Sequence, residues 1–159
     1  MSASAKPASP LQASSPDFAA RIRGAFERQA AMRLIGARLL HVAPGEVDIE
    51  LPFSSHITQQ HGFVHAGMIG AALDSACGFA ALTLMPVDAG VLTVEYKLNL
   101  LSPAIGERFR LIGRVRKPGR TILLAEGDAL AASADGTDKL VATMTATLMT
   151  IRDRGDVRD

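Results

Sequence analysis

The feature that most constrains this chain is one long, nearly uncharged stretch. Residues 66–87, AGMIGAALDSACGFAALTLMPV, carry a single ionisable acid, Asp74. A segment that is apolar all round must be enclosed, either as the core helix of a soluble domain or as a membrane span. A carboxylate near the centre of a span would cost about 2.5–3.5 kcal/mol on insertion scales. The sequence therefore predicts a buried helix over 66–84, ended by Pro86.

The carboxylate of Asp74 needs its own explanation. Burying an unpaired carboxylate costs several kcal/mol, so such groups are usually paired, protonated or functional. Close packing of the helix on a sheet explains the small residues around it, but not the acid. Two readings stay open, a satisfied internal hydrogen-bond network and a catalytic or ligand-binding acid, and the second is favoured. The small residues share one helical face with the acid, at spacings of three and four: Gly67, Ala71, Asp74, Gly78 and Ala81.

The rest of the chain predicts an α+β domain in which strands surround this helix. Ser15-Pro16-Asp17 is an N-cap signal, and it predicts a short N-terminal helix over 16–31. Because strands are expected before and after the central helix, a curved antiparallel sheet wrapped around it is the expected architecture. The predicted strands are 34–42 and 46–53, joined by a type II turn at Ala43-Pro44-Gly45, and then an antiparallel meander of 91–101, 107–117, 120–132 and 140–151.

Two strands alternate in a way that predicts their faces. In the strand 91–101, one face carries Leu92, Val94, Tyr96, Leu98 and Leu100, and the other carries Thr93, Glu95, Lys97 and Asn99. The strand 107–117 carries an arginine row at positions 108, 110, 114 and 116, which predicts a solvated face or protection of a sheet edge.

Composition limits the function classes. The 159 residues, 48% of them hydrophobic, suffice for one domain with one core. The net charge of +1 gives no overall field for nucleic acid or a membrane surface. Cys77, the single cysteine, cannot form an intrachain disulfide, so we expect an inert core thiol and a cytoplasmic location.

The domain is expected to span residues 16–151. Residues 1–15 are rich in Ser, Ala and Pro and lack the apolar run of a signal peptide, so they predict a disordered tail. The charged residues 152–159 predict a frayed end. His56, His61 and His65 lie close in sequence without a carboxylate or cysteine to complete a ligand set, so no metal site is predicted.

The loop before the helix carries a motif. Residues 59–67 read QQHGFVHAG, with Asp74 nine residues after the histidine. This resembles the N-x-x-G-x-x-H-G-G stretch of hotdog-fold acyl-CoA thioesterases of the PaaI type, which leads into a central helix bearing an acid. The segments VLTVEYKLNLLSPAIGERF and RKPGRT are similar to the family's next strand and basic turn. The resemblance covers about residues 34–151, with Gln59 in place of the family's asparagine and Ala66 in place of its first glycine.

The resemblance implies a hotdog fold and hydrolysis of an acyl-CoA thioester. Asp74 would be the general base or the nucleophile, and Thr93 would position the water. Backbone N–H groups at a helix start can polarise a carbonyl, so Ala66 and Gly67 would form the oxyanion hole. The other implied roles are Gln59 orienting water or the carbonyl, His65 bracing the loop or contacting the thioester, Gly62 and Phe63 binding substrate, and Arg116, Lys117 and Arg120 binding coenzyme A phosphates.

The resemblance also implies a homodimer, or a dimer of dimers, with each site at a subunit boundary. The acid would come from one chain and the loop residues from the other. No metal or prosthetic cofactor is implied, since coenzyme A is part of the substrate. Two other functions remain open, a non-catalytic acyl-CoA binding module and a hotdog hydratase or dehydratase. An apolar lining favours a medium-chain or aromatic acyl group: Phe63, Met68, Phe79 and Met85.

Overall fold

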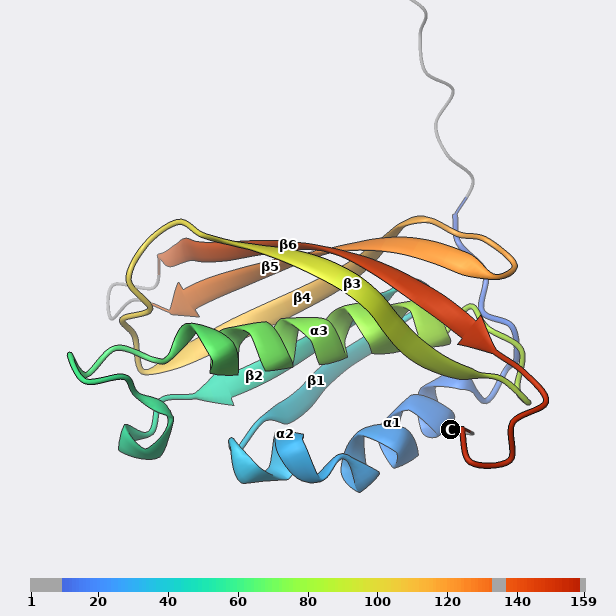
Figure 1. The fold of residues 1–159 in the computed structure, drawn as a ribbon, viewed down its shortest axis with the longest axis horizontal. Coiled ribbons are helices and arrows are strands. Elements are labelled where there is room, and N and C mark those ends of the chain that lie inside the picture. The colour runs from blue at the N-terminus through green and yellow to red at the C-terminus, as the bar shows by residue number, and fades with distance from the viewer. Residues whose placement is uncertain (1–9, 133–136, 158–159) are drawn as a thin grey trace, which may run out of the picture.

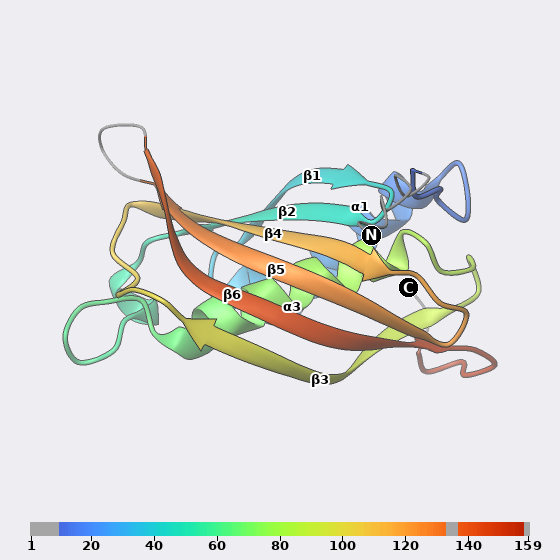
Figure 2. The same cartoon turned by 90° about the horizontal axis from the view of Figure 1, so that it is seen from above.

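A curved antiparallel sheet encloses one long helix in the computed structural model, which describes residues 10–132 and 137–157 (Figures 1 and 2). Within these residues the sheet has six strands in the order β1-β2-β4-β5-β6-β3. The predicted α+β class, with a curved antiparallel sheet wrapped around one central helix, is confirmed. The elements are α1 (Phe18–Arg28), α2 (Ala30–Leu34), β1 (Arg38–Ala43), β2 (Glu46–Pro52), a 3-10 turn (Ser55–Ile57), α3 (Ala66–Leu82), β3 (Gly90–Leu100), β4 (Arg108–Lys117), β5 (Ile122–Ala132) and β6 (Asp138–Ile151).

Helix α3 lies directly on the backbone of the sheet. Gly113 of β4 and Gly127 of β5 are paired opposite each other. A Cβ atom on Gly113 would lie 2.6 Å from the Cys77 nitrogen and closer still to the Ala76 carbonyl. A Cβ on Gly127 would lie 3.0 Å from the Cys77 Sγ. The two glycines therefore set how closely α3 approaches the sheet just beyond Asp74.

Gly113→Ala should lower the free energy of unfolding by about 1–3 kcal/mol, because the added methyl group overpacks a backbone contact. Urea unfolding followed by circular dichroism would measure the change. Gly155→Ala is the matched control, since a Cβ there meets nothing within 4 Å. Equal stability of the two variants would contradict the close approach of α3 to β4.

Cys77 lies at this contact and is fully buried. Burial, with smaller contributions from nearby carboxylates led by Asp74, raises the pKa of the thiol to about 12. The thiol therefore stays protonated and unreactive, as expected for a core cysteine. Among the described helices, none is both long enough and apolar enough to cross a membrane.

The predicted meander is wrong for one strand. β3 pairs with β6 and forms an edge of the sheet, whereas β4 pairs with β2 on one side and β5 on the other (Figure 2). Hydrophobic alternation identifies strands and their faces, but it contains no information about which strand pairs with which. The chain passes from β3 past the start of α3 to reach β4, so these two neighbours in sequence are separated in the sheet by β5 and β6.

The predicted N-terminal helix is also divided in two. At Gln29 the backbone leaves the helical region, with φ −70° and ψ 100°, and α2 begins at the next residue, Ala30. Residues 30–34 are therefore helical, and the first strand begins at Arg38 rather than at residue 34. The break lets α1 bury Ile22 and Phe26 while α2 buries Met32.

Part of each predicted tail packs against the domain. The Ser14 N–H donates to the Thr83 carbonyl at 3.2 Å, and its hydroxyl bonds the Met85 carbonyl, so residues 10–15 are not a free tail. Residues 1–9 lie outside the described residues. At the other end, Val157 lies against Gly90 at the start of β3.

Candidate active site

Asp74 lies midway along α3, partly exposed, and the Thr93 hydroxyl of β3 donates to its Oδ1 at 2.7 Å. The two residues that the resemblance assigns to the base and to the positioning of water are therefore in direct contact. This contact also shows that the acid has a specific partner, rather than lying unpaired in the core.

A β-bulge turns Thr93 toward the helix. Thr93 pairs with the buried Leu148 of β6, whereas Glu95 pairs with Thr147, so Val94 is an extra residue in the ladder. Paired residues of antiparallel strands point to the same face. Thr93 therefore points to α3, and Glu95 points away and accepts a bond from Thr147 Oγ1 at 3.2 Å. The prediction that Thr93 and Glu95 share a face is wrong, because strict alternation does not include a bulge.

Burial raises the pKa of the Asp74 carboxyl above its ordinary value, and the hydrogen bond from Thr93 opposes this in part. A carboxylate with a raised pKa is a stronger base than one in water. The pair therefore combines a basic oxygen with a hydroxyl that fixes its orientation.

Replacing Thr93 by Val should move the acid limb of the kcat/KM pH profile to higher pH. The hydroxyl lowers the pKa of Asp74, so its loss raises that pKa further, and a base acts only when deprotonated. We also expect a fall in kcat/KM of roughly 10-fold or more at neutral pH, since a hydrogen bond to a charged group contributes about 1.5–3 kcal/mol. Thr145→Val, on the exposed face of β6, is the control. If the acid limb of the pH profile does not move in Thr93→Val, the hydrogen bond from Thr93 does not lower the pKa of the catalytic group.

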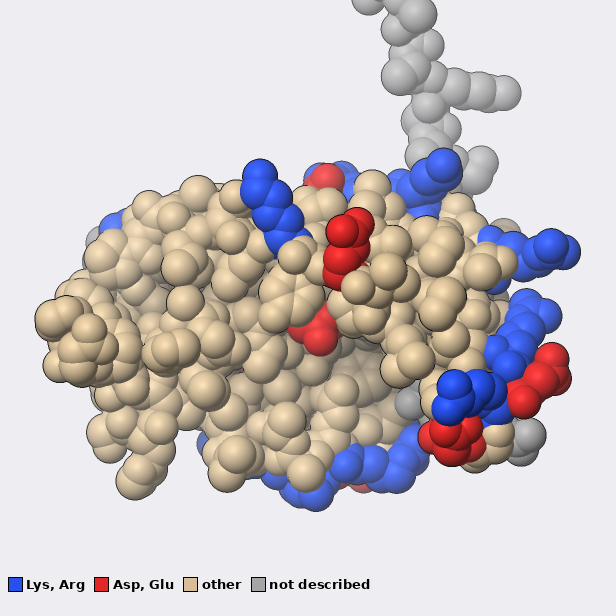
Figure 3. Space-filling model, viewed as in Figure 1, with Lys and Arg blue, Asp and Glu red and all other residues tan. Residues whose placement is uncertain are grey.

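The Asp74 carboxylate opens into a cavity of about 280 Å³ between α3, β3 and the α1–α2 junction. Gly78, one turn beyond Asp74, leaves open space, because a Cβ there would meet nothing within 4 Å. The face bearing β3, α3 and α1 is hollowed near its centre and carries few charged side chains over its left half (Figure 3). The cavity is lined by Gln29, Asp74, Ser75, Gly78, Phe79, Val91, Leu92 and Thr93.

The start of α3 is capped by the histidine of the motif. His65 Nδ1 accepts a hydrogen bond from the Gly67 N–H at 2.9 Å. The prediction of Gly67 as an oxyanion donor therefore has to be corrected, because this N–H is already bonded. The Ala66 N–H has no hydrogen-bond acceptor among the described residues. Ala66 also lines a cavity of about 420 Å³. One of the two predicted donors is thus available.

Gln59 and Phe63 line the same cavity as Ala66. Gln59 Oε1 accepts from the His61 N–H, and the Gln59 N–H donates to the Phe63 carbonyl at 2.8 Å, so the loop folds back on itself. Gly62 lies in this turn with φ +83°, a conformation that favours glycine. Gly62 and Phe63 also line a neighbouring cavity of about 580 Å³.

The predicted oxyanion donor and the predicted base are separated within one chain. Ala66 and Asp74 are eight residues apart on the same helix, which places them about 12 Å apart along its axis. A single thioester carbonyl cannot reach both groups. Within one chain the two parts of the candidate site, its half-sites, therefore lie apart, one at the start of α3 and one at its middle.

The predicted coenzyme A cations lie at the β4–β5 turn, at the opposite end of the molecule from the 59–65 loop (Figures 1 and 2). Arg116 is paired with Glu126, so its charge is already compensated. For the exposed Lys117 and Arg120, no side-chain bond or ion pair is found within residues 10–132 and 137–157. These two remain candidates for binding phosphate.

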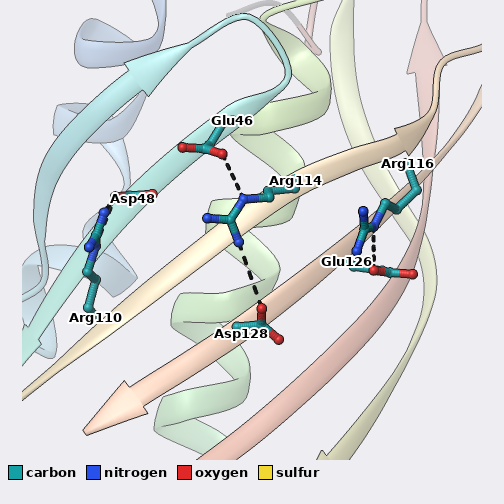
Figure 4. Close-up of polar contacts among 7 residues, drawn as sticks. All are labelled: Glu46, Asp48, Arg110, Arg114, Arg116, Glu126 and Asp128. Atoms are coloured by element: carbon teal, nitrogen blue, oxygen red, sulfur yellow. Dashed lines mark hydrogen bonds and ion pairs between the residues drawn. The ribbon is translucent and has the colours of Figure 1, made fainter. Parts of the chain in front are cut away.

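The arginine row is largely an ion-paired outer face of the sheet (Figure 4). Arg110 bonds Asp48, and Arg114 lies 2.7 Å from Glu46 and 3.8 Å from Asp128. The prediction of a merely solvated row was therefore incomplete. No group of three or more His, Cys, Asp or Glu side chains suited to a metal is found in the part of the chain that the structure describes.

Comparison with known proteins agrees with this geometry. The family model described as the Thioesterase superfamily matches residues 61–134. A solved thioesterase family protein from Silicibacter pomeroyi is 49% identical, with a TM-score of 0.83 over 85% of this chain and 98% of that chain. A phenylacetic acid degradation-related protein from Ralstonia eutropha JMP134, assigned as a thioesterase, is 28% identical with a TM-score of 0.71, over 83% and 98% of the two chains. A protein from Saccharolobus solfataricus assigned as an esterase is 30% identical over 94 residues, 59% of this chain and 66% of that relative.

The chain belongs to the thioesterase superfamily, whose members have the hotdog fold, and it is a hydrolase of thioesters. Its structural relatives include proteins linked to phenylacetic acid degradation. Sequence reasoning missed two polar residues of the Asp74 cavity, because neither a motif nor a periodicity marks them: Gln29 and Ser75.

Proposed function

We propose that this protein is an acyl-CoA thioesterase in which Asp74 carries the chemistry. The observation that supports this most directly is the Asp74–Thr93 pair, whose carboxylate has a raised pKa and opens into a cavity. A carboxylate of this kind can remove a proton from water as it attacks the thioester carbon, or attack that carbon itself. Both routes give the free acid and coenzyme A.

Each complete site is proposed to form between two copies of the chain. β3 is a sheet edge, and its unpaired backbone groups can pair with another strand. Ala66 and Asp74 of one chain lie about 12 Å apart along α3. The oxyanion donor that acts with Asp74 therefore has to come from a second copy of the chain. Four large apolar side chains of this strand are about half exposed in the single chain: Leu92, Val94, Tyr96 and Leu100.

A two-fold axis through β3 would assemble the two half-sites. Antiparallel pairing of β3 with its copy places the end of one strand beside the start of the other. The motif loop lies at the end of β3, where the Val64 N–H bonds the Ala104 carbonyl at 3.2 Å. Thr93 lies near the start of β3. The loop of one copy would therefore approach Asp74 of the other.

In the assembled site each group has a defined task. Asp74 accepts the proton of the attacking water, while Thr93 holds the carboxylate. The Ala66 N–H of the second copy stabilises the negative charge on the carbonyl oxygen as the tetrahedral intermediate forms. When the carbon–sulfur bond breaks, the thiolate leaves and takes up a proton. Gln59 is proposed to hold the water or the carbonyl, and Lys117 and Arg120 to bind the phosphates of coenzyme A.

A panel of acyl-CoA thioesters tests this function, with released coenzyme A measured by a thiol-detecting reagent. The panel should contain short, medium-chain and aromatic acyl groups, with analytical ultracentrifugation of the same sample. We expect turnover of at least one acyl class by a dimer or a dimer of dimers. Tight binding of acyl-CoA without turnover would instead support a binding module, and turnover by a stable monomer would contradict the shared site.

A further inference from the structure

The α1–α2 junction delivers a polar side chain to the Asp74 cavity. Gln29 is the residue at which the backbone leaves the helix, and its side chain reaches α3 rather than capping α2. The Ser75 hydroxyl donates to Gln29 Oε1 at 3.1 Å. Ser75 is buried, and Gln29, Asp74 and Ser75 line one cavity, so this bond holds the amide at the cavity into which the carboxylate opens.

The contact with Ser75 fixes which end of the amide is available. Because Oε1 accepts the hydroxyl proton, the Nε2 group keeps both of its protons for other acceptors. Within the described residues no acceptor for Gln29 Nε2 is found, although Gln29 lines the cavity. Asp74 already accepts a bond from Thr93. The cavity therefore offers an amide donor that the protein itself does not use.

The size and lining of the cavity limit what could accept this bond. In the single chain its volume is about 280 Å³, which suits a short acyl chain or a single ring beside the carboxylate. Four of its residues are polar and surround the place where the acyl group would meet the carboxylate: Gln29, Asp74, Ser75 and Thr93. A plain alkyl group there would leave the amide donor desolvated and unpaired, which is unfavourable.

We infer that Gln29 determines substrate specificity, with its Nε2 donating to an oxygen that the acyl group carries close to the thioester. The preferred substrates are then hydroxy- or oxo-substituted acyl thioesters of short length, rather than the corresponding plain acyl thioesters. This inference rests on the proposed thioesterase function, because it concerns the same cavity. Gly78 contributes by leaving space for the substituent.

Gln29→Met tests this, since it keeps the length of the side chain and removes the amide. The probes are 3-hydroxybutanoyl-CoA and butanoyl-CoA, compared by kcat/KM. We expect the hydroxylated-to-plain ratio to fall by about 3- to 10-fold, the usual effect of losing one neutral hydrogen bond. Ser75→Ala should lower the ratio in the same direction, because the amide is no longer held. Gln12→Met, at an exposed position, is the matched control and should leave the ratio unchanged.

Two results would overturn the inference. One is an unchanged ratio in both Gln29→Met and Ser75→Ala. The other is an equal loss of kcat/KM for both substrates in Gln29→Met, which would show that Gln29 binds the attacking water and not the acyl group. Calorimetric binding of the two matching non-hydrolysable thioethers gives a readout without turnover. If the wild-type protein binds the hydroxylated thioether more tightly, loses this preference in Gln29→Met and yet hydrolyses nothing, the inference stands and the proposed function fails.

Discussion

Replacing Asp74 by Asn is expected to lower kcat/KM for acyl-CoA hydrolysis by about three orders of magnitude. Asparagine keeps the size of the side chain and can still contact Thr93, but it can neither accept the proton of water nor attack the thioester. Positioned acid–base groups typically contribute roughly 10²- to 10⁴-fold, and the expected loss lies in the middle of this range. Release of coenzyme A at neutral pH measures it.

The same variant should remain folded, which separates a catalytic from a structural acid. Because burial raises the pKa of Asp74, the folded protein binds its proton more tightly than the unfolded chain does. The ionised group therefore destabilises the fold, and this contribution lowers stability as pH rises from the ordinary pKa through the raised one. Asp74→Asn removes this penalty, so its stability at neutral pH should equal or exceed that of the wild type. Asp88→Asn, at an exposed position, is the matched control for the chemical change. Full activity in Asp74→Asn would show that Asp74 is neither the general base nor the nucleophile.

Replacing Ala66 by Pro should lower kcat by roughly 10²- to 10³-fold, the usual effect of removing one oxyanion donor. The substitution is selective because Ala66 is the first residue of α3, where proline fits and where its missing N–H breaks no helical bond. His65 before it has φ −63° and ψ 134°, the extended conformation that a following proline requires. The fold should therefore be preserved, as circular dichroism and thermal unfolding would show.

Ala66→Val separates loss of the N–H from added bulk. Valine adds a larger side chain beside the cavity and keeps the backbone donor, so it should retain more activity than proline. If valine and proline impair kcat equally, steric blocking explains both variants and the Ala66 N–H is not the donor.

Mixing the two inactive proteins tests the shared site directly. If each site takes Asp74 from one copy and Ala66 from the other, a mixed dimer holds one site with both substitutions and one intact site. Random exchange of subunits between Asp74→Asn and Ala66→Pro should then restore about a quarter of wild-type activity, since half of the dimers are mixed. No restoration after proven exchange would place both groups in one chain.

Much of the fold could be predicted because the sequence carries strong local signals. An apolar run interrupted only by Asp74 and ended by Pro86 predicts a helix as far as residue 84, two residues beyond the observed end of α3 at Leu82. The Pro44-Gly45 turn and the alternation of β2 predict the hairpin, and Gly45 has the expected positive φ of 76°. Strand pairing was predicted wrongly for β3, because pairing depends on contacts between distant segments.

The candidate site was predictable in its parts and not in its assembly. Asp74 stands out because a charge interrupts an apolar segment. The bulge at Val94 has no sequence signal, so alternation alone assigns Thr93 to the wrong face. Gln29 was hidden because a polar residue at the end of a surface helix is ordinary until a fold places it against Ser75.

The extra residue in β3 restricts how this strand can rearrange. Because of the bulge, Thr93 and Glu95 lie opposite consecutive residues of β6, Leu148 and Thr147. Deleting Val94 would therefore give an unbroken ladder in which Thr93 still faces α3 and Glu95 still faces away. Flattening the bulge with Val94 retained would instead shift the earlier residues by one position and turn Thr93 away from Asp74. The strand can thus lose the extra residue, but it cannot keep that residue in a regular ladder without losing the contact.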